Sequence, residues 1–109
     1  MNFKEYQELA RRTQNTEITL AEQERHALFG MASEVGEIHA VYQKVFQGHN
    51  MDYMKVVDEM GDLMWFLAEL ADSIGVTLDD VAEHNIAKLK KRYPKGFDVE
   101  HSVHREEYA

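Results

Sequence analysis

Four acidic residues fall into two pairs with the same spacing. Glu34 and Glu37 are three residues apart in SEVGEIHAV, and Glu59 and Asp62 are three apart in DEMGDLMWFLAEL. Residues three apart lie about one turn apart on one face of a helix, so each pair directs two carboxylates to the same side. Both pairs adjoin apolar residues, where an ionised carboxylate without a partner is costly. The pattern therefore indicates a positively charged partner for these acids.

A divalent cation is the partner that the spacing favours. If the two helices pack antiparallel, the pairs can meet, and a hard cation with a preference for oxygen, Mg²⁺ or Mn²⁺, offsets the repulsion. Gly36 and Gly61 lie inside the two motifs. Because glycine costs up to about 1 kcal/mol relative to alanine within a helix, both indicate close helix approach there. The alternative is that both pairs belong to solvated helix faces.

A basic region follows the acids in the chain. Asn85, Lys88 and Arg92 recur at steps of three and four, which places them on one face of a helix. Beside a metal held by acids, Lys88 and Arg92 suit the binding of phosphate groups. The alternative is a solvated basic helix end, which the helix dipole favours at a C-terminus.

Other catalytic patterns are not found in the sequence. The histidines are scattered without a metal-binding spacing, and His26 and His39 are interpreted as surface or packing residues. A phosphate-binding glycine loop and a dinucleotide fingerprint are missing as well. Trp65 and Phe66 are expected in the core, with stacking on a nucleobase as the alternative for either ring.

Length, composition and charge set the class of protein. The chain has 109 residues, 44% of them hydrophobic, which predicts a single globular domain over residues 1–109. One proline and no cysteine argue against a turn-rich or disulfide-bonded fold. A net charge of −8 argues against binding a nucleic acid polymer. Neither a membrane span nor a signal peptide is apparent, so we expect a soluble, cytoplasmic protein.

Helical periodicity accounts for most of the chain, and the predicted fold class is all-α. A first short helix covers about 3–10, with Asn2 as its N-cap. A long second helix starts after Thr19, whose spacing to Glu22 is that of a capping box, and reaches about residue 47. A third runs from Asp52 to about residue 74. A fourth starts at about residue 77 and stops at Pro94, followed by a short tail over 95–109.

The long helices carry apolar stripes. In the second helix the expected packing seam consists of Leu28, Met31, Val35, Ile38, Tyr42 and Val45. In the third helix one stripe consists of Val57, Met60, Met64, Leu67, Ala71 and Ile74, and a second of Val56, Leu63, Phe66 and Leu70. A helix that is apolar almost all round is buried on most sides. Because 109 residues can hardly cover it, we expect a homo-oligomer formed through the long helices.

Three segments together resemble a known family. SEVGEIHAV, DEMGDLMWFLAEL and NIAKLKKRYPKGF resemble the MazG-type nucleoside triphosphate pyrophosphohydrolases of the all-α NTP pyrophosphatase superfamily, over about residues 20–97. The resemblance implies a four-to-five-helix bundle that forms homodimers or homotetramers. It also implies Mg²⁺, with Mn²⁺ as the alternative. One position departs from the family pattern, because the first acid of its Glu-Glu pair is Ser33 here.

The resemblance also assigns roles to residues. It implies that Glu34, Glu37, Glu59 and Asp62 bind the metal, and that Asn85, Lys88 and Arg92 bind phosphates. Glu34 and Glu37 would act in catalysis with Lys88 and Arg92, Glu37 as the candidate general base. Phe66 and Trp65 are the candidate base contacts.

The implied reaction is hydrolysis of a nucleoside triphosphate to the monophosphate and pyrophosphate. Two alternatives stay open. One is another activity of the superfamily, on phosphoribosyl-ATP or deoxyuridine nucleotides. The other is a helical oligomerisation module without enzymatic activity.

Overall fold

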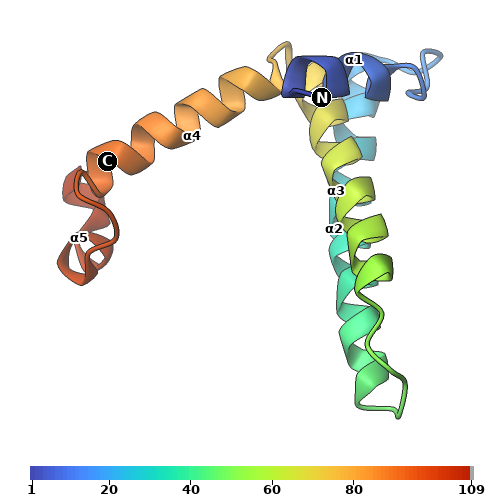
Figure 1. The fold of residues 1–109 in the computed structure, drawn as a ribbon. Coiled ribbons are helices and arrows are strands. Elements are labelled where there is room, and N and C mark those ends of the chain that lie inside the picture. The colour runs from blue at the N-terminus through green and yellow to red at the C-terminus, as the bar shows by residue number, and fades with distance from the viewer. Residues whose placement is uncertain (109) are drawn as a thin grey trace. The chain divides into compact units, whose positions relative to one another are not determined.

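The structure, a computed structural model, describes residues 1–108, and these are helical as the sequence predicts. The helices are α1 (Phe3–Arg11), α2 (Leu20–Val45), α3 (Tyr53–Ile74), α4 (Leu78–Arg92) and α5 (Val99–Val103), followed by the 3₁₀ turn η1 (Arg105–Tyr108) (Figure 1). The chain divides into two compact units, Met1–Thr77 and a second that begins at Leu78. The predicted organisation as one domain over 1–109 stays a prediction.

The helix starts follow the predicted capping residues. The Asn2 side chain accepts a hydrogen bond from the Glu5 N–H at 2.9 Å, and α1 begins at the next residue. Thr19 and Glu22 form the full capping box at the start of α2. Asp52 caps α3, and Gly75, with φ at 76°, ends it in the left-handed conformation that glycine adopts without strain. These local signals place both ends of α3, the helix that carries Glu59 and Asp62.

Helices α2 and α3 lie side by side and antiparallel in the first unit (Figure 1). The inward side of α3 contains the second predicted stripe, in which Val56 is buried and Leu63, Phe66 and Leu70 are half-buried. The acid Glu59 is buried on the same side. On α2, the ring of Phe66 packs against Gly30 and occupies the space that a Cβ would need. Small side chains let the two backbones approach, and Ala27 and Ala68 are completely buried.

A second side of α3 holds α1. The indole N–H of Trp65 donates to the Ala10 carbonyl at 3.2 Å and to Thr13 Oγ1 at 2.8 Å. Asp72 accepts hydrogen bonds from Gln7 and Gln14 and forms an ion pair with Arg11 at 2.7 Å. Burial raises the pKa of Asp72, but these hydrogen bonds and the Arg11 charge outweigh it and the pKa is lowered. Asp72 therefore stays ionised and links α1 to α3.

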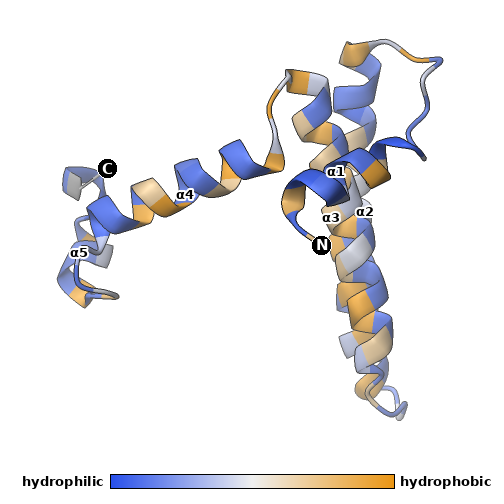
Figure 2. Cartoon of the chain, turned by 45° about the horizontal axis from the view of Figure 1, so that its top comes forward, coloured by the Kyte–Doolittle hydropathy of each residue, from blue (hydrophilic) through white to orange (hydrophobic). Residues whose placement is uncertain are grey.

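The remaining apolar stripes are not covered. In the first predicted stripe of α3, Ala71 is buried, whereas the other residues are more than a third exposed: Val57, Met60, Met64, Leu67 and Ile74. The predicted seam of α2 is mostly uncovered within the chain, because four of its six residues are also more than a third exposed: Leu28, Val35, Tyr42 and Val45. Figure 2 shows hydrophobic residues along both helices. Helical periodicity defines a face, but it does not tell which face packs within the chain.

Two further expectations differ from the structure. Gly36 and Gly61 were expected at points of close helix approach, but no other part of the chain lies within 4 Å of a Cβ built at either residue. The expected tail after Pro94 contains the short helix α5, which Asp98 caps by accepting from the His101 N–H at 3.1 Å. Within residues 1–108, no helix combines the length and apolar character needed to cross a bilayer.

The contact between Gly30 and Phe66 leads to a stability prediction. Alanine at Gly30 would gain up to about 1 kcal/mol in helix propensity, but its Cβ would overlap the Phe66 ring. Since overpacking costs about 1–3 kcal/mol, we expect Gly30→Ala to lower the free energy of unfolding by about 1 kcal/mol or more. Urea denaturation measures it.

Gly36→Ala provides the matched control, because the new methyl group enters open space on the same helix. This variant should be up to about 1 kcal/mol more stable than the wild type. Equal stabilisation by both alanines would show that the Phe66 ring does not confine Gly30.

Candidate metal centre

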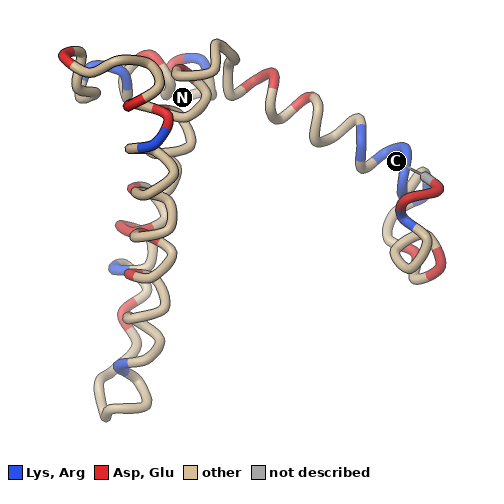
Figure 3. Tube along the Cα trace, turned by 180° about the vertical axis from the view of Figure 1, so that it is seen from behind, with Lys and Arg blue, Asp and Glu red and all other residues tan. Residues whose placement is uncertain are grey.

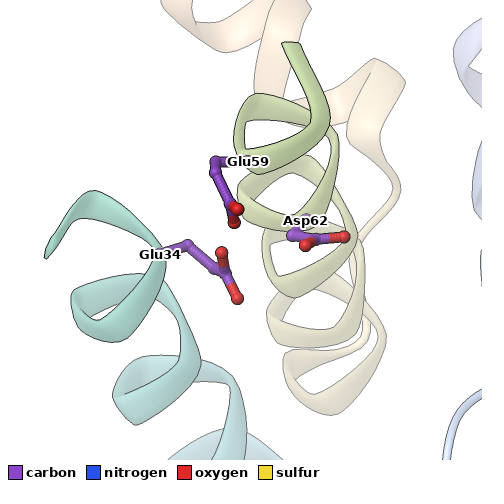
Figure 4. A group of neighbouring side chains, drawn as sticks. All are labelled: Glu34, Glu59 and Asp62. Carbon is purple, nitrogen blue, oxygen red and sulfur yellow. The ribbon is translucent and has the colours of Figure 1, made fainter. Parts of the chain in front are cut away.

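Three carboxylates from two helices meet at the seam of the first unit. Glu34 on α2 and Glu59 and Asp62 on α3 each offer an oxygen, and these oxygens lie within 4.8 Å of one another (Figure 4). Glu59 is buried, Glu34 is half-buried and Asp62 is exposed. Antiparallel packing thus brings Glu34 close to acids 25 and 28 positions later in the sequence, and it joins three of the four acids that were expected to meet.

Crowding of negative charge changes the protonation of Glu34. A hydrogen bond to Glu59 raises the pKa of Glu34 most, followed by burial and by the charges of Asp62, Glu59 and Glu37, to about 7. Glu34 therefore holds a proton over much of the acidic range when no cation is bound. Its carboxyl donates that proton toward Glu59, so the two acids share one hydrogen bond instead of repelling each other.

Glu59 has a cationic partner that the sequence analysis did not single out. Lys55 Nζ lies 2.9 Å from Glu59 Oε1, one turn earlier on α3, and is half exposed. Its hydrogen bond, with that from Glu34, lowers the pKa of Glu59. The i,i+4 spacing of Lys55 and Glu59 is a signal visible in the sequence.

Glu37 lies outside the group of three. It is exposed on α2, one turn beyond Glu34, and its charge contributes to the raised pKa of Glu34. It is therefore near the cluster, and its predicted role as a metal ligand or base stays a prediction.

The donor set suits a hard divalent cation. All three side chains offer carboxylate oxygens, the ligands that Mg²⁺ and Mn²⁺ prefer. Glu34 Oε2 is buried and has no hydrogen-bond partner among the described residues, so one acceptor of the cluster is open to a cation. A cation that replaced the Glu34 proton would satisfy this oxygen and offset the repulsion.

The two aromatic candidates have packing contacts. Trp65 is held to α1 by its indole hydrogen bonds, and its ring meets Phe66 edge-on with centroids 5.1 Å apart. Phe66 also contacts His26, at 5.6 Å between centroids, and covers Gly30. Both rings are half-buried beside the acids on α3, and base contacts for either remain predictions.

The basic candidates belong to the second unit. Asn85, Lys88 and Arg92 lie on α4, and Lys and Arg gather at its C-terminal end (Figure 3). Lys88 and Arg92 are half-buried, and Asn85 is exposed. Their predicted phosphate contacts stay a prediction.

One buried polar pair was missed in the sequence. Glu69 is completely buried, and its Oε1 lies 2.8 Å from Nδ1 of His26, which is more than half exposed. His26 was interpreted as a surface or packing residue. The available signal was the seven-residue step from Asp62 to Glu69, which returns to the same face of α3 after two turns.

The raised pKa of Glu34 predicts a pH dependence of stability. Because the folded state holds the proton more tightly than the unfolded chain, the metal-free protein should lose stability as pH rises from about 5 to about 7.5. Glu34→Gln should flatten this slope, since the amide does not titrate. Urea denaturation with a chelator, at several pH values, measures the slope.

Glu17→Gln is the control, because Glu17 is an exposed acid in the loop before α2. It should keep the wild-type slope. The lowered pKa values of Glu59 and Asp72 act at lower pH and oppose the effect only there. An identical slope for wild type and Glu34→Gln would contradict the assignment.

Comparisons with known proteins indicate the family of the chain. The model of the MazG nucleotide pyrophosphohydrolase domain matches residues 3–97. Gene 37 protein of Mycobacterium phage L5 is 31% identical over 78 residues, which cover 65% of this chain and 67% of that protein. No solved structure matches the chain. The family match covers both motifs that supply the three carboxylates, and the chain belongs to the MazG nucleotide pyrophosphohydrolase family.

Proposed function

We propose that the protein is a Mg²⁺-dependent nucleoside triphosphate pyrophosphohydrolase, which converts a ribo- or deoxyribonucleoside triphosphate and water to the monophosphate and pyrophosphate. The observation that carries the proposal is the group of three carboxylates from α2 and α3 in a chain of the MazG family. Mn²⁺ is the alternative cation. The proposed location is the cytoplasm, without a nucleic acid polymer as partner.

In this proposal Glu34, Glu59 and Asp62 hold the cation, and Glu37, one turn beyond Glu34 on α2, joins them or accepts a proton. A bound divalent cation would polarise phosphate oxygens and lower the barrier to attack by water at the α-phosphate. Glu37 is exposed and adjacent to the cluster, which suits a general base that receives the proton of that water. Because Ser33 replaces the first acid of the family's Glu-Glu pair, the role of general base falls to Glu37 or to a neighbouring acid.

The second unit supplies the phosphate-binding groups in the proposal. Lys88 and Arg92 would offset the charge that develops on the pyrophosphate leaving group, with Asn85 as a further hydrogen-bond donor. Their support is the family match, which extends to residue 97, and the basic end of α4. Phe66 and Trp65 remain the proposed aromatic contacts of the base.

A nucleotide screen tests the proposal against its alternatives. Nucleoside triphosphates, deoxyuridine nucleotides and phosphoribosyl-ATP are incubated with Mg²⁺, and pyrophosphate is measured separately from phosphate. Release of pyrophosphate from nucleoside triphosphates supports the proposal. Turnover confined to phosphoribosyl-ATP or deoxyuridine nucleotides assigns another activity of the superfamily, and no turnover of any compound favours a non-enzymatic module.

Asp62→Asn tests the role of the acids. The amide keeps the shape but removes a charge and a strong metal ligand, so we expect activity to fall at least about 100-fold. The metal-free variant should be no less stable than the wild type, because repulsion in the cluster is relieved. Saturating Mg²⁺, at about 100 times the Kd, should stabilise the wild type by about 2.7 kcal/mol and the variant less. Thermal melts and a pyrophosphate assay measure both effects.

Asp58→Asn is the matched control, because Asp58 is an exposed acid on α3 next to Glu59 but outside the cluster. It should keep both the activity and the Mg²⁺-dependent melting shift. If millimolar Mg²⁺ does not raise the melting temperature of the wild type, the acids belong to a solvated helix face and do not bind a metal.

We also propose that the protein is a homodimer or homotetramer assembled through its long helices. The exposed stripe of α3 is too apolar and too continuous for the surface of a small monomer. Replacing Met64 and Leu67 together with Glu places charge in the middle of this stripe. We expect this variant to sediment as a monomer with unchanged helix content.

The double variant Val99→Glu/Val103→Glu serves as control, since it introduces the same two charges at exposed apolar residues of α5. It should sediment like the wild type. A wild type that is monomeric at micromolar concentration would contradict the proposed assembly.

A further inference from the structure

Glu69 is a carboxylate whose burial the metal centre does not explain. It is completely buried, yet within residues 1–108 only His26 bonds to it, through Oε1, and Oε2 has no hydrogen-bond partner. A buried carboxylate with one hydrogen bond costs stability that an apolar residue would not. A contribution to folding is therefore a poor explanation for it.

Glu69 fixes the orientation of His26. The 2.8 Å contact places Nδ1 of His26, and not Nε2, against Oε1 of Glu69, and a carboxylate oxygen is satisfied there by the tautomer that carries its hydrogen on Nδ1. In the neutral ring Nε2 is then an acceptor. The His26 ring packs against the Phe66 ring, and the His26 side chain is more than half exposed. Nε2 of His26 makes no hydrogen bond within the described chain. The pair therefore presents one oriented acceptor on the surface of the first unit.

This acceptor lies along the same seam as the acids. His26 precedes Glu34 by eight residues of α2, about 12 Å along the helix, and Glu69 follows Asp62 by seven residues of α3, about 10 Å. The half-buried Phe66 ring lies between the two positions, since it contacts both Gly30 and His26. The separation between the acids and the His26–Glu69 pair along the helices is of the order of the length of a nucleotide from its phosphates to its base.

The two ends of the seam between α2 and α3 differ in charge, which indicates how a nucleotide would be oriented along it. Lys55 precedes Glu59 by four residues, so it lies about 6 Å further from Phe66 along α3. A half-exposed ammonium group at that end attracts phosphates, whereas the aromatic ring at the other end suits a nucleoside. A triphosphate held at the acids would then extend its nucleoside toward Phe66 and His26.

We propose that His26 is a specificity residue and that Glu69 is its positioning residue. Nε2 of His26 accepts a hydrogen bond from the nucleoside half of the substrate, either from an N–H of the base or from an O–H of the sugar. The inference rests on the proposed binding of nucleoside triphosphates at Glu34, Glu59 and Asp62.

His26→Asn separates this role from a structural one. The Asn amide nitrogen takes the place of Nδ1 and still donates to Glu69, but nothing takes the place of Nε2. His39→Asn is the matched control, because His39 is an exposed histidine on the same helix. For each protein, calorimetry with Mg²⁺ measures the affinity for each common ribo- and deoxyribonucleoside triphosphate and for inorganic triphosphate, which has no nucleoside. Melting temperature and kcat/KM are measured in parallel.

For His26→Asn we expect affinity and kcat/KM for the preferred nucleotide to fall about three- to tenfold, the loss of one hydrogen bond. Binding of inorganic triphosphate, the melting temperature and all values for His39→Asn should stay unchanged. A changed ratio between ribo- and deoxyribonucleotides assigns the contact to the sugar, and changed ratios among bases assign it to the base. Glu69→Gln should retain most selectivity, since its amide oxygen still accepts from Nδ1.

Three results would overturn the inference. One is an equal loss for inorganic triphosphate and nucleotides, and another is unchanged nucleotide selectivity in His26→Asn. The third is wild-type binding that does not distinguish nucleotides from inorganic triphosphate. The binding ratios need no turnover, so a protein that discriminates nucleotides through His26 without releasing pyrophosphate would refute the proposed hydrolysis and not the role of His26.

Discussion

Repulsion among acids within a helix seam is the constraint on which this structure depends. Glu34 and Glu59 face each other across α2 and α3, and Asp62 adds a third carboxylate within 4.8 Å. Without a cation the protein limits this repulsion by keeping a proton on Glu34, whose pKa rises to about 7. The seam must therefore be held closed by contacts elsewhere along the two helices, at Gly30 and among buried alanines.

The short helix α1 contributes to that closure from the other side of α3. Trp65 and Asp72 each bind α1, through the indole N–H and through the network with Arg11 and Gln7. These contacts hold a second side of α3, so they fix the rotation of α3 about its own axis. Once this rotation is fixed, the directions of Glu59 and Asp62 are fixed as well. A helix that supplies none of the three carboxylates thus helps to determine their geometry.

Sequence patterns predicted the parts of this arrangement that depend on local chemistry. Asn2, Thr19 and Asp52 mark helix starts because capping is satisfied within three residues, and the acid pairs follow from helical spacing. Which apolar stripe of a helix is buried depends on the helix that packs against it, and periodicity does not identify that helix. For the same reason the contact of Phe66 at Gly30 was overlooked, and Gly36 and Gly61 were wrongly expected at points of close helix approach. The seven-residue step from Asp62 places Glu69 on the face of the acids, but no local pattern identifies His26, 43 residues away, as its partner.

Helix α3 has three functional faces, and their directions relative to one another are fixed by the geometry of the helix. One face aligns Glu59 and Asp62 with Glu34, a second binds α1 through Trp65 and Asp72, and the third is the exposed apolar stripe. Successive residues of a helix are separated by a fixed angle, so a rotation that moved the stripe would carry the carboxylates away from Glu34. Any surface that covers the stripe must therefore accept α3 in the orientation that the acids and α1 impose. The geometry of the three carboxylates thus restricts which surfaces could cover the stripe.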